Sequence, residues 1–129
     1  FNKMNIPESL KYTKEHEWVL VEGNIGTIGV TEYAQGELGD VVFVDIDPAL
    51  SEVKKGESIG TIEAVKTVSD IFAPYTGKVV EINAEIKDSP EVVNSDPYGK
   101  GWMIKVEISD NAELTDLLDA SAYKALIGQ

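Results

Sequence analysis

Residues 61–70 read TIEAVKTVSD, with a single lysine, Lys66, near the middle of a run dominated by small, β-branched and acidic residues. Stiff β-branched side chains favour extended backbone, so the run predicts strand. The whole β-branched stretch, residues 58–73, is too long for one ordinary strand, and we expect the chain to reverse direction inside it. No Gly, Pro or Asn marks that reversal. A helix that places Ile62, Val65, Val68 and Phe72 on one face is the competing interpretation.

The flanking sequence carries the same β pattern. Strand signals separated by turn residues occur at 18–21, 25–30, 41–46, 58–65, 78–83 and 102–108. Gly77, in PYTGK, reads as a turn requirement. Two helices are expected, one over 32–38 with Thr31 as its cap and one over 113–128, where leucines recur at helical spacing. The pattern predicts one mostly β domain over residues 1–129, a sandwich or barrel-like fold with short peripheral helices and a C-terminal helix.

Composition excludes several classes of function. The formal net charge is −12 and the pI about 4.3, so nucleic acid and anionic membranes are poor partners. No apolar run approaches the roughly 18 residues of a membrane span. All 11 cations are lysines, there is no cysteine, and His16 is the only histidine. Thiol nucleophiles and thiolate or multi-histidine metal sites are therefore absent, and the chain resembles a substrate of enzymes more than an enzyme.

Lys66 is the candidate site of a covalent modification. An ordinary lysine is a solvated surface group, but one at a hairpin tip between short neighbours is freely reachable by a modifying enzyme. Acylation of such an ammonium removes its charge. Carrier domains present a swinging prosthetic group in this way.

Several longer motifs bear a resemblance to one family. They are LKYTKEHEWV (10–19), IGVTEYAQGELGDVVFVDI (28–46), EAVKTVSDIFAP (63–74), SPEVVNSDPYGKGWMIKV (89–106) and LLDASAY (117–123). Together they resemble the H proteins of the glycine cleavage system over roughly residues 6–127. The resemblance implies a flattened β-sandwich of the lipoyl/biotinyl type, with the chain reversal at Lys66 and lipoic acid attached to that lysine as an amide.

The resemblance also implies the partners. A lipoylating enzyme would attach the cofactor, and a pyridoxal-phosphate glycine decarboxylase would load it with an aminomethyl group. A tetrahydrofolate-dependent aminomethyltransferase would take the one-carbon unit, and a dihydrolipoyl dehydrogenase would reoxidise the dithiol. The chain itself would be a non-catalytic monomeric carrier, located in a bacterial cytoplasm or a mitochondrial matrix.

Three carboxylates are the candidate residues around the arm. Glu63 and Asp70 flank Lys66 and are candidates for recognition by the lipoylating enzyme. Glu17, in the HEW segment, and Asp70 are the candidates for a cleft in which a carboxylate pairs with the amine of the loaded arm. The competing interpretation is that these are ordinary surface carboxylates in a chain with 23 of them.

The other conspicuous side chains read as structural. His16 lacks an evident serine or cysteine partner and is expected to pack or hydrogen-bond. Trp18 and Trp102 are expected in or near the core, and Asn94 is expected to fix a loop against the sandwich.

Four other functions remain open at this stage. A biotin carrier normally has methionines beside its lysine, where this chain has Val65 and Thr67. Lipoyl domains of 2-oxo acid dehydrogenases are usually shorter parts of longer chains. An H-like protein that donates lipoyl groups to other enzymes would use the same lysine. An acid/base hydrolase would need a defined carboxylate pair, and none stands out.

Overall fold

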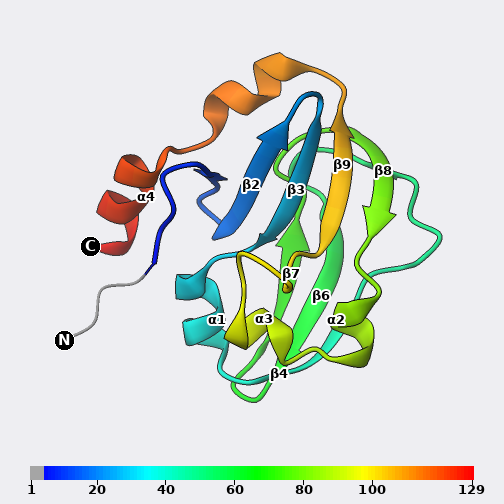
Figure 1. Cartoon of the computed structure of the whole chain (residues 1–129), viewed down its shortest axis with the longest axis vertical. Helices are drawn as coiled ribbons and strands as arrows, with labels where there is room; N and C mark the ends of the chain where they lie inside the picture. Colours follow the sequence, from blue (N-terminus) through cyan, green and yellow to red (C-terminus); the bar gives the residue numbers. More distant parts are fainter. Residues whose placement is uncertain (1–4) are drawn as a thin grey trace.

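Two antiparallel sheets face each other in the computed structural model, which describes residues 5–129 (Figure 1). The larger sheet has the order β1-β2-β3-β9-β8-β5, and the smaller one has the order β4-β6-β7. The strands of the larger sheet are β1 (Lys11–Tyr12), β2 (Glu17–Glu22), β3 (Ile25–Val30), β9 (Ile104–Ile108), β8 (Gly77–Ile82) and β5 (Glu52–Val53). Those of the smaller sheet are β4 (Val41–Asp45), β6 (Ser58–Ala64) and β7 (Val68–Phe72). The predicted flattened sandwich is confirmed, and the sheets do not close into a barrel.

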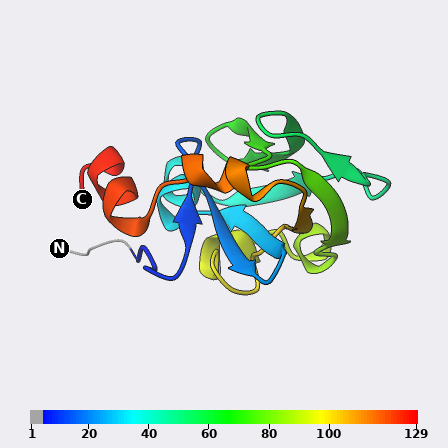
Figure 2. The ribbon, with the colours of Figure 1, turned by 90° about the horizontal axis from the view of Figure 1, so that it is seen from above.

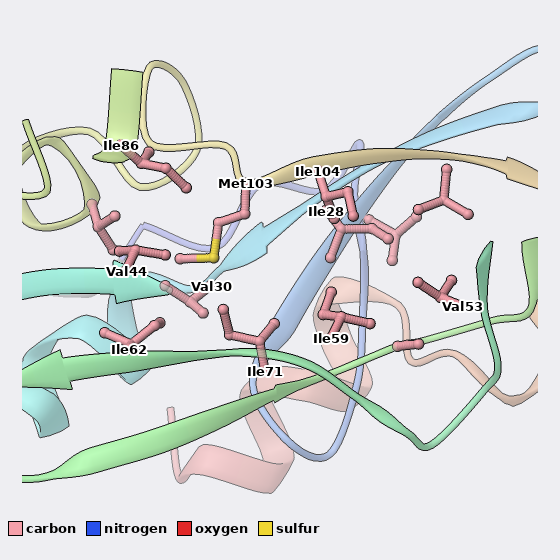
Figure 3. Close-up of a cluster of buried hydrophobic side chains, with 14 of the residues drawn as sticks. Ile28, Val30, Val44, Val53, Ile59, Ile62, Ile71, Ile86, Met103 and Ile104 are labelled. Atoms are coloured by element: carbon pink, nitrogen blue, oxygen red, sulfur yellow. The ribbon is translucent and has the colours of Figure 1, made fainter. Parts of the chain in front are cut away.

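Buried aliphatic side chains fill the space between the sheets. Figure 3 shows Ile28, Val30 and Ile104 from the larger sheet meeting Ile59, Ile62 and Ile71 from the smaller one. Each is at most 5% exposed. Their inward direction follows from the two-residue period of a strand, which sends alternate side chains to the core. The outer face of the smaller sheet is left exposed at Glu63 and Asp70.

The C-terminal region differs from its prediction. Instead of one helix over 113–128, a 3₁₀ helix (Asn111–Asp116) is followed by an extended turn and then by α4 (Ala120–Ile127). Leu118 exchanges backbone hydrogen bonds with Tyr12, which holds it extended, and Asp119 caps the new helix through Ala122 N. Tertiary pairing with β1 therefore overrides the helical spacing of the leucines. Figure 2 shows α4 lying beyond one end of the two sheets.

Three shorter helices complete the fold, α1 (Glu32–Leu38), α2 (Glu85–Asp88) and α3 (Val92–Ser95). α1 begins after Thr31, whose hydroxyl accepts from Ala34 N as predicted. α2 and α3 were not predicted. The last strand was predicted over 102–108 and is shorter, since Trp102 and Met103 precede β9. No helix among residues 5–129 is long and apolar enough to cross a membrane.

Gly77 is required for close strand packing and not, as predicted, for a turn. It lies within β8, and a Cβ built on it would be 1.8 Å from the carbonyl oxygen of Glu107 and 2.8 Å from Cγ1 of Val106. Backbone atoms of β9 cannot yield as a flexible side chain can. Glycine is therefore needed at this position because the two strands approach too closely for a side chain.

We expect Gly77→Ala to lower the free energy of unfolding by about 2–4 kcal/mol, because the methyl group would force β8 and β9 apart. Denaturant titration measures the effect. Gly36→Ala in α1, where a Cβ meets nothing within 4 Å, is the control and should stabilise by up to about 1 kcal/mol. Equal stability of the two variants would contradict this role for Gly77.

Candidate functional site

Lys66 lies at the tip of the β6–β7 hairpin. Val65 and Lys66 form the turn, which is closed by a 2.9 Å hydrogen bond from Ala64 N to Thr67 O. Both turn residues are exposed, Val65 at 71%. The helical interpretation of this stretch is thus wrong, and the strand interpretation is right. The tip presents one ammonium group that neighbouring side chains leave uncovered.

The turn is held in place by the loop after α1. Val65 N donates to Asp40 O at 2.9 Å, and Lys66 N donates to Leu38 O at 3.3 Å. Neither turn residue has a positive φ, so the turn needs no glycine. The shape of the tip is imposed by hydrogen bonds from another part of the chain, which is why turn residues do not mark it in the sequence.

Asn94, in α3, fixes that loop in turn. Its amide nitrogen donates to Gly39 O at 3.0 Å and to Gln35 Oε1 at 2.9 Å, and its oxygen accepts from Val41 N at 2.8 Å. The prediction that Asn94 fixes a loop is confirmed. Through this loop, α3 supports the position of Lys66.

The lysine side chain lies over Gly39. A Cβ built on Gly39 would be 3.3 Å from Cγ, 3.4 Å from Cδ and 3.5 Å from Cε of Lys66. Gly39 ends α1 with φ 82° and ψ −162°, a conformation that is essentially restricted to glycine. The glycine therefore both ends the helix and leaves room for the stem of Lys66.

We expect Gly39→Ala to lower the free energy of unfolding by about 1–3 kcal/mol from backbone strain and also to displace Lys66. Gly56→Ala is the matched control, because Gly56 has φ +85° but nothing within 4 Å of its Cβ position. Both changes should destabilise, whereas only Gly39→Ala should alter the rate at which acetic anhydride labels Lys66, measured by peptide mass spectrometry. Equal labelling in both variants would show that the contact with Gly39 does not position the lysine.

A cleft of about 250 Å³ opens between α1, β7 and the start of β2. It is lined by Glu15, His16, Glu17, Val30, Tyr33, Ala34, Glu37, Leu38, Ile62, Ser69 and Asp70. The cleft therefore brings together Glu17 and Asp70, two of the three carboxylates singled out in the sequence. Leu38 connects it to Lys66, because Leu38 lines the cleft and accepts the hydrogen bond from Lys66 N.

Glu17 is the buried member of the pair. It is 2% exposed, its Oε1 accepts from the hydroxyl of Thr13, and its Oε2 accepts from Phe72 N at 3.2 Å. Burial raises the pKa of Glu17 to about 7, against the lowering effect of these two hydrogen bonds. A carboxyl group with a pKa near neutrality changes charge easily when a cation arrives.

Asp70 and Glu63 are both exposed. Asp70 accepts a 3.0 Å hydrogen bond from the hydroxyl of Ser58 and lies at the edge of the cleft. Glu63 pairs with Val68 across the hairpin and does not line the cleft. The two acidic residues that flank Lys66 share the exposed face of the hairpin but differ in their relation to the cleft, because Asp70 lines its edge and Glu63 does not.

Sequence reasoning missed two carboxylates of the cleft, Glu15 and Glu37. A signal for Glu37 exists, since Tyr33, Ala34, Glu37 and Leu38 recur at the spacing of one helix face. With Glu17 and Asp70 they make four carboxylates, and no lysine is among the lining residues. The cleft is suited to a small cation with an apolar stem.

A larger hollow of about 520 Å³ lies between β4 and β8 and shares no lining residue with the cleft. Its lining is mostly apolar and includes none of Lys66, Glu63, Asp70 and Glu17. Size alone would favour it as a ligand site. We place the functional site at the smaller cleft because that cleft joins the exposed lysine to the buried carboxylate.

Comparison with known proteins gives concordant matches. The family model described as Glycine cleavage H-protein matches residues 10–129. The Glycine cleavage system H protein of Staphylococcus haemolyticus (strain JCSC1435) is 59% identical over 126 residues, covering 98% of this chain and 100% of that protein. That of Staphylococcus carnosus (strain TM300) is 57% identical with the same coverage. The crystal structure of a glycine cleavage system H protein from Mycobacterium marinum superposes with a TM-score of 0.87 at 38% identity, covering 96% of this chain and 100% of that one.

Proposed function

The chain belongs to the glycine cleavage H-protein family, and on this premise we propose that it carries a lipoyl arm on Lys66 and delivers an aminomethyl group between enzymes. Proteins of this family are carriers and not catalysts. The observation that supports the assignment to Lys66 is its place at an exposed turn beside an acidic cleft.

The residues present fit a lipoyl amide. Lys66 is exposed, its stem has a defined course over Gly39, and the cleft beside it has an apolar wall of Val30, Leu38 and Ile62. When bound, the lipoyl group supplies a disulfide that can accept the aminomethyl group and two electrons. This chemistry explains how a chain without cysteine can serve a redox cycle.

The cleft residues hold the cargo. The aminomethyl group carries an ammonium at neutral pH, and Glu17 and Asp70, which both line the cleft, accept hydrogen bonds from it. The ammonium favours the charged form of Glu17, so Glu17 gives up its remaining proton as the cargo arrives. The apolar wall limits access of water, which strengthens the pairing and slows hydrolysis of the cargo.

The partner enzymes follow from the same scheme. Glycine decarboxylase loads the arm, the tetrahydrofolate-dependent aminomethyltransferase unloads it, and dihydrolipoyl dehydrogenase reoxidises it. Glu63, exposed on the outer face beside the hairpin tip, is available to the lipoylating enzyme. The net charge of −12 attracts the chain to basic clefts on these enzymes.

Reconstitution with glycine decarboxylase tests the proposal. We expect exchange of labelled bicarbonate into glycine with the lipoylated chain and none with the unlipoylated chain. A lipoylated chain that supports no exchange would overturn the proposal. If that chain instead donated its lipoyl group to other acceptor domains, the H-like relay function would replace it.

A further inference from the structure

His16 has an unusual backbone conformation at the wall of the cleft. Its φ is 70°, and it is the only residue other than glycine with a positive φ among residues 5–129. The segment is fixed on both sides, since His16 N donates to Thr13 O at 3.1 Å and His16 O accepts from Thr31 N at 3.1 Å. Left-handed backbone at a non-glycine residue persists where the surroundings enforce it, often at functional sites.

Two hydroxyl groups in series lead to the imidazole of His16. The hydroxyl of Thr31 lies 2.7 Å from that of Tyr123, which lies 2.9 Å from Nδ1 of His16. Thr31 and Tyr123 are both fully buried. Tyr123 comes from α4, 107 residues away in the sequence, so the C-terminal helix is connected directly to the cleft.

The direction of these hydrogen bonds follows from counting donors. The Thr31 oxygen accepts from Ala34 N as the cap of α1, so its own hydrogen is free to go to Tyr123. Tyr123 then donates to Nδ1 of His16. The reverse direction would leave the Thr31 hydrogen without an acceptor in the described part of the chain, at a fully buried position. This count favours Nδ1 as the acceptor, with the proton of the neutral imidazole on Nε2.

This arrangement opposes protonation of His16. A charged imidazole donates from both nitrogens, but Nδ1 faces a hydroxyl whose hydrogen already points toward it. Burial lowers the pKa of His16, while Glu15 on its own loop and Glu37 on α1 act to raise it, and the lowering dominates.

The remaining titratable groups around His16 are Tyr33 of α1, whose ring centroid is 4.8 Å away, Tyr123 of α4, and Glu17 and Asp70 on the shared cleft.

We propose that His16 is a positioning residue of the cleft, held neutral by the Thr31–Tyr123 hydroxyl chain so that the walls present only negative charge to the ammonium of the cargo. The identity of the cargo rests on the proposed function. A positive charge on His16 would oppose the same ammonium that Glu17 and Asp70 attract. The hydroxyl chain thus allows the cleft to bind a cation at lower pH than it could with a protonated His16.

The test uses Tyr123→Phe in the full-length chain. The variant keeps the ring that stacks on Tyr12 at 4.6 Å and removes the hydroxyl donor. Tyr75→Phe is the matched control, since it also removes a buried hydroxyl. The Tyr75 hydroxyl donates to Val106 O at a distance of 2.6 Å, and Tyr75 does not line the cleft. Chemical denaturation of both variants reports the stability lost with a hydroxyl.

Nitrogen-15 NMR of the unlipoylated chain gives the first readout. We expect the wild type to show His16 with its proton on Nε2, and Tyr123→Phe to increase the proton affinity of His16 by about three- to tenfold. Tyr75→Phe should change neither the position of the proton on His16 nor the proton affinity of His16. A wild-type proton on Nδ1, or an unchanged titration in Tyr123→Phe, would overturn the proposal.

The lifetime of the loaded state gives the second readout. After loading by glycine decarboxylase, mass spectrometry should show about three- to tenfold faster loss of the cargo from Tyr123→Phe than from wild type at pH 6.5, and equal rates at pH 8.5. Adding His16→Asn, which is neutral and tolerates a positive φ, should restore the lifetime at pH 6.5. Equal acceleration at both pH values, or no restoration, would overturn the positioning role. A wild type that accepts no cargo would overturn the proposed function, and the NMR readout would still decide whether His16 is held neutral.

Discussion

Lys66→Arg is expected to abolish glycine–bicarbonate exchange completely while leaving the fold intact. The guanidinium stays protonated and is not acylated under conditions that modify an amine. The change keeps the net charge of −12 and the backbone hydrogen bonds of the turn, so the free energy of unfolding should change by less than about 0.5 kcal/mol. Exchange measured in the reconstituted system, together with denaturant unfolding, checks both parts.

Lys54→Arg is the matched control for this change. Lys54 is also an exposed lysine at a turn, but that turn precedes β6, whereas the hairpin tip follows the other end of the same strand. We expect full exchange activity from it. Residual activity of Lys66→Arg above that of the unlipoylated chain, or an equal loss in Lys54→Arg, would contradict the role given to Lys66.

Glu17→Gln is expected to stabilise the unmodified chain at neutral pH while weakening its hold on the cargo. The pKa of Glu17 is about 7 in the folded chain against 4.5 in the unfolded one. Below pH 4.5 both states hold the proton, and the residue contributes no pH dependence. Between pH 4.5 and 7 only the unfolded state ionises freely, so wild-type stability falls as the pH rises. Above pH 7 the loss levels off at about 3 kcal/mol.

Glutamine does not ionise and lacks this dependence on pH. It also loses one acceptor oxygen for Thr13 or Phe72, a cost of about 1 kcal/mol that does not vary with pH. The difference in unfolding free energy between variant and wild type should therefore shift in favour of the variant by about 3 kcal/mol from pH 4.5 to pH 7.5. Denaturant titrations across this range measure it. Parallel curves for the two proteins would show that Glu17 is not held near neutrality by burial.

The same variant should release its cargo faster. Loss of a charged hydrogen bond worth about 1.5–3 kcal/mol corresponds to a lifetime shortened by roughly ten- to a hundredfold. Gain of stability with loss of cargo retention would identify Glu17 as a residue kept for function at a cost in stability. An unchanged lifetime of the loaded state would show that Glu17 does not hold the cargo in the cleft.

The strands could be predicted because each carries a local signal. β3 was predicted over 25–30 and spans Ile25–Val30, since its β-branched residues and the flanking turn are sufficient. The hairpin turn could not be located from local residues. Its shape depends on backbone hydrogen bonds to Asp40 and Leu38, contacts that form only when α1 packs beside the hairpin.

Parts of the site were also predictable, but its assembly was not. Lys66 was singled out from its neighbours in the sequence, Glu17 and Asp70 were singled out through the family resemblance, and the structure places the two carboxylates on one cleft. The connection from His16 to Tyr123 spans 107 residues and depends on where α4 docks. That docking begins at Leu118, whose extended pairing with Tyr12 was predicted as helix. Long-range pairing of this kind leaves no periodic pattern in the sequence.

Peptide mass mapping of the chain from a lipoylating host tests directly whether Lys66 carries the lipoyl group. We predict a lipoyl adduct in amide linkage on Lys66 and unmodified lysines elsewhere. A biotin adduct on Lys66, or a lipoyl adduct on any other lysine, would contradict it.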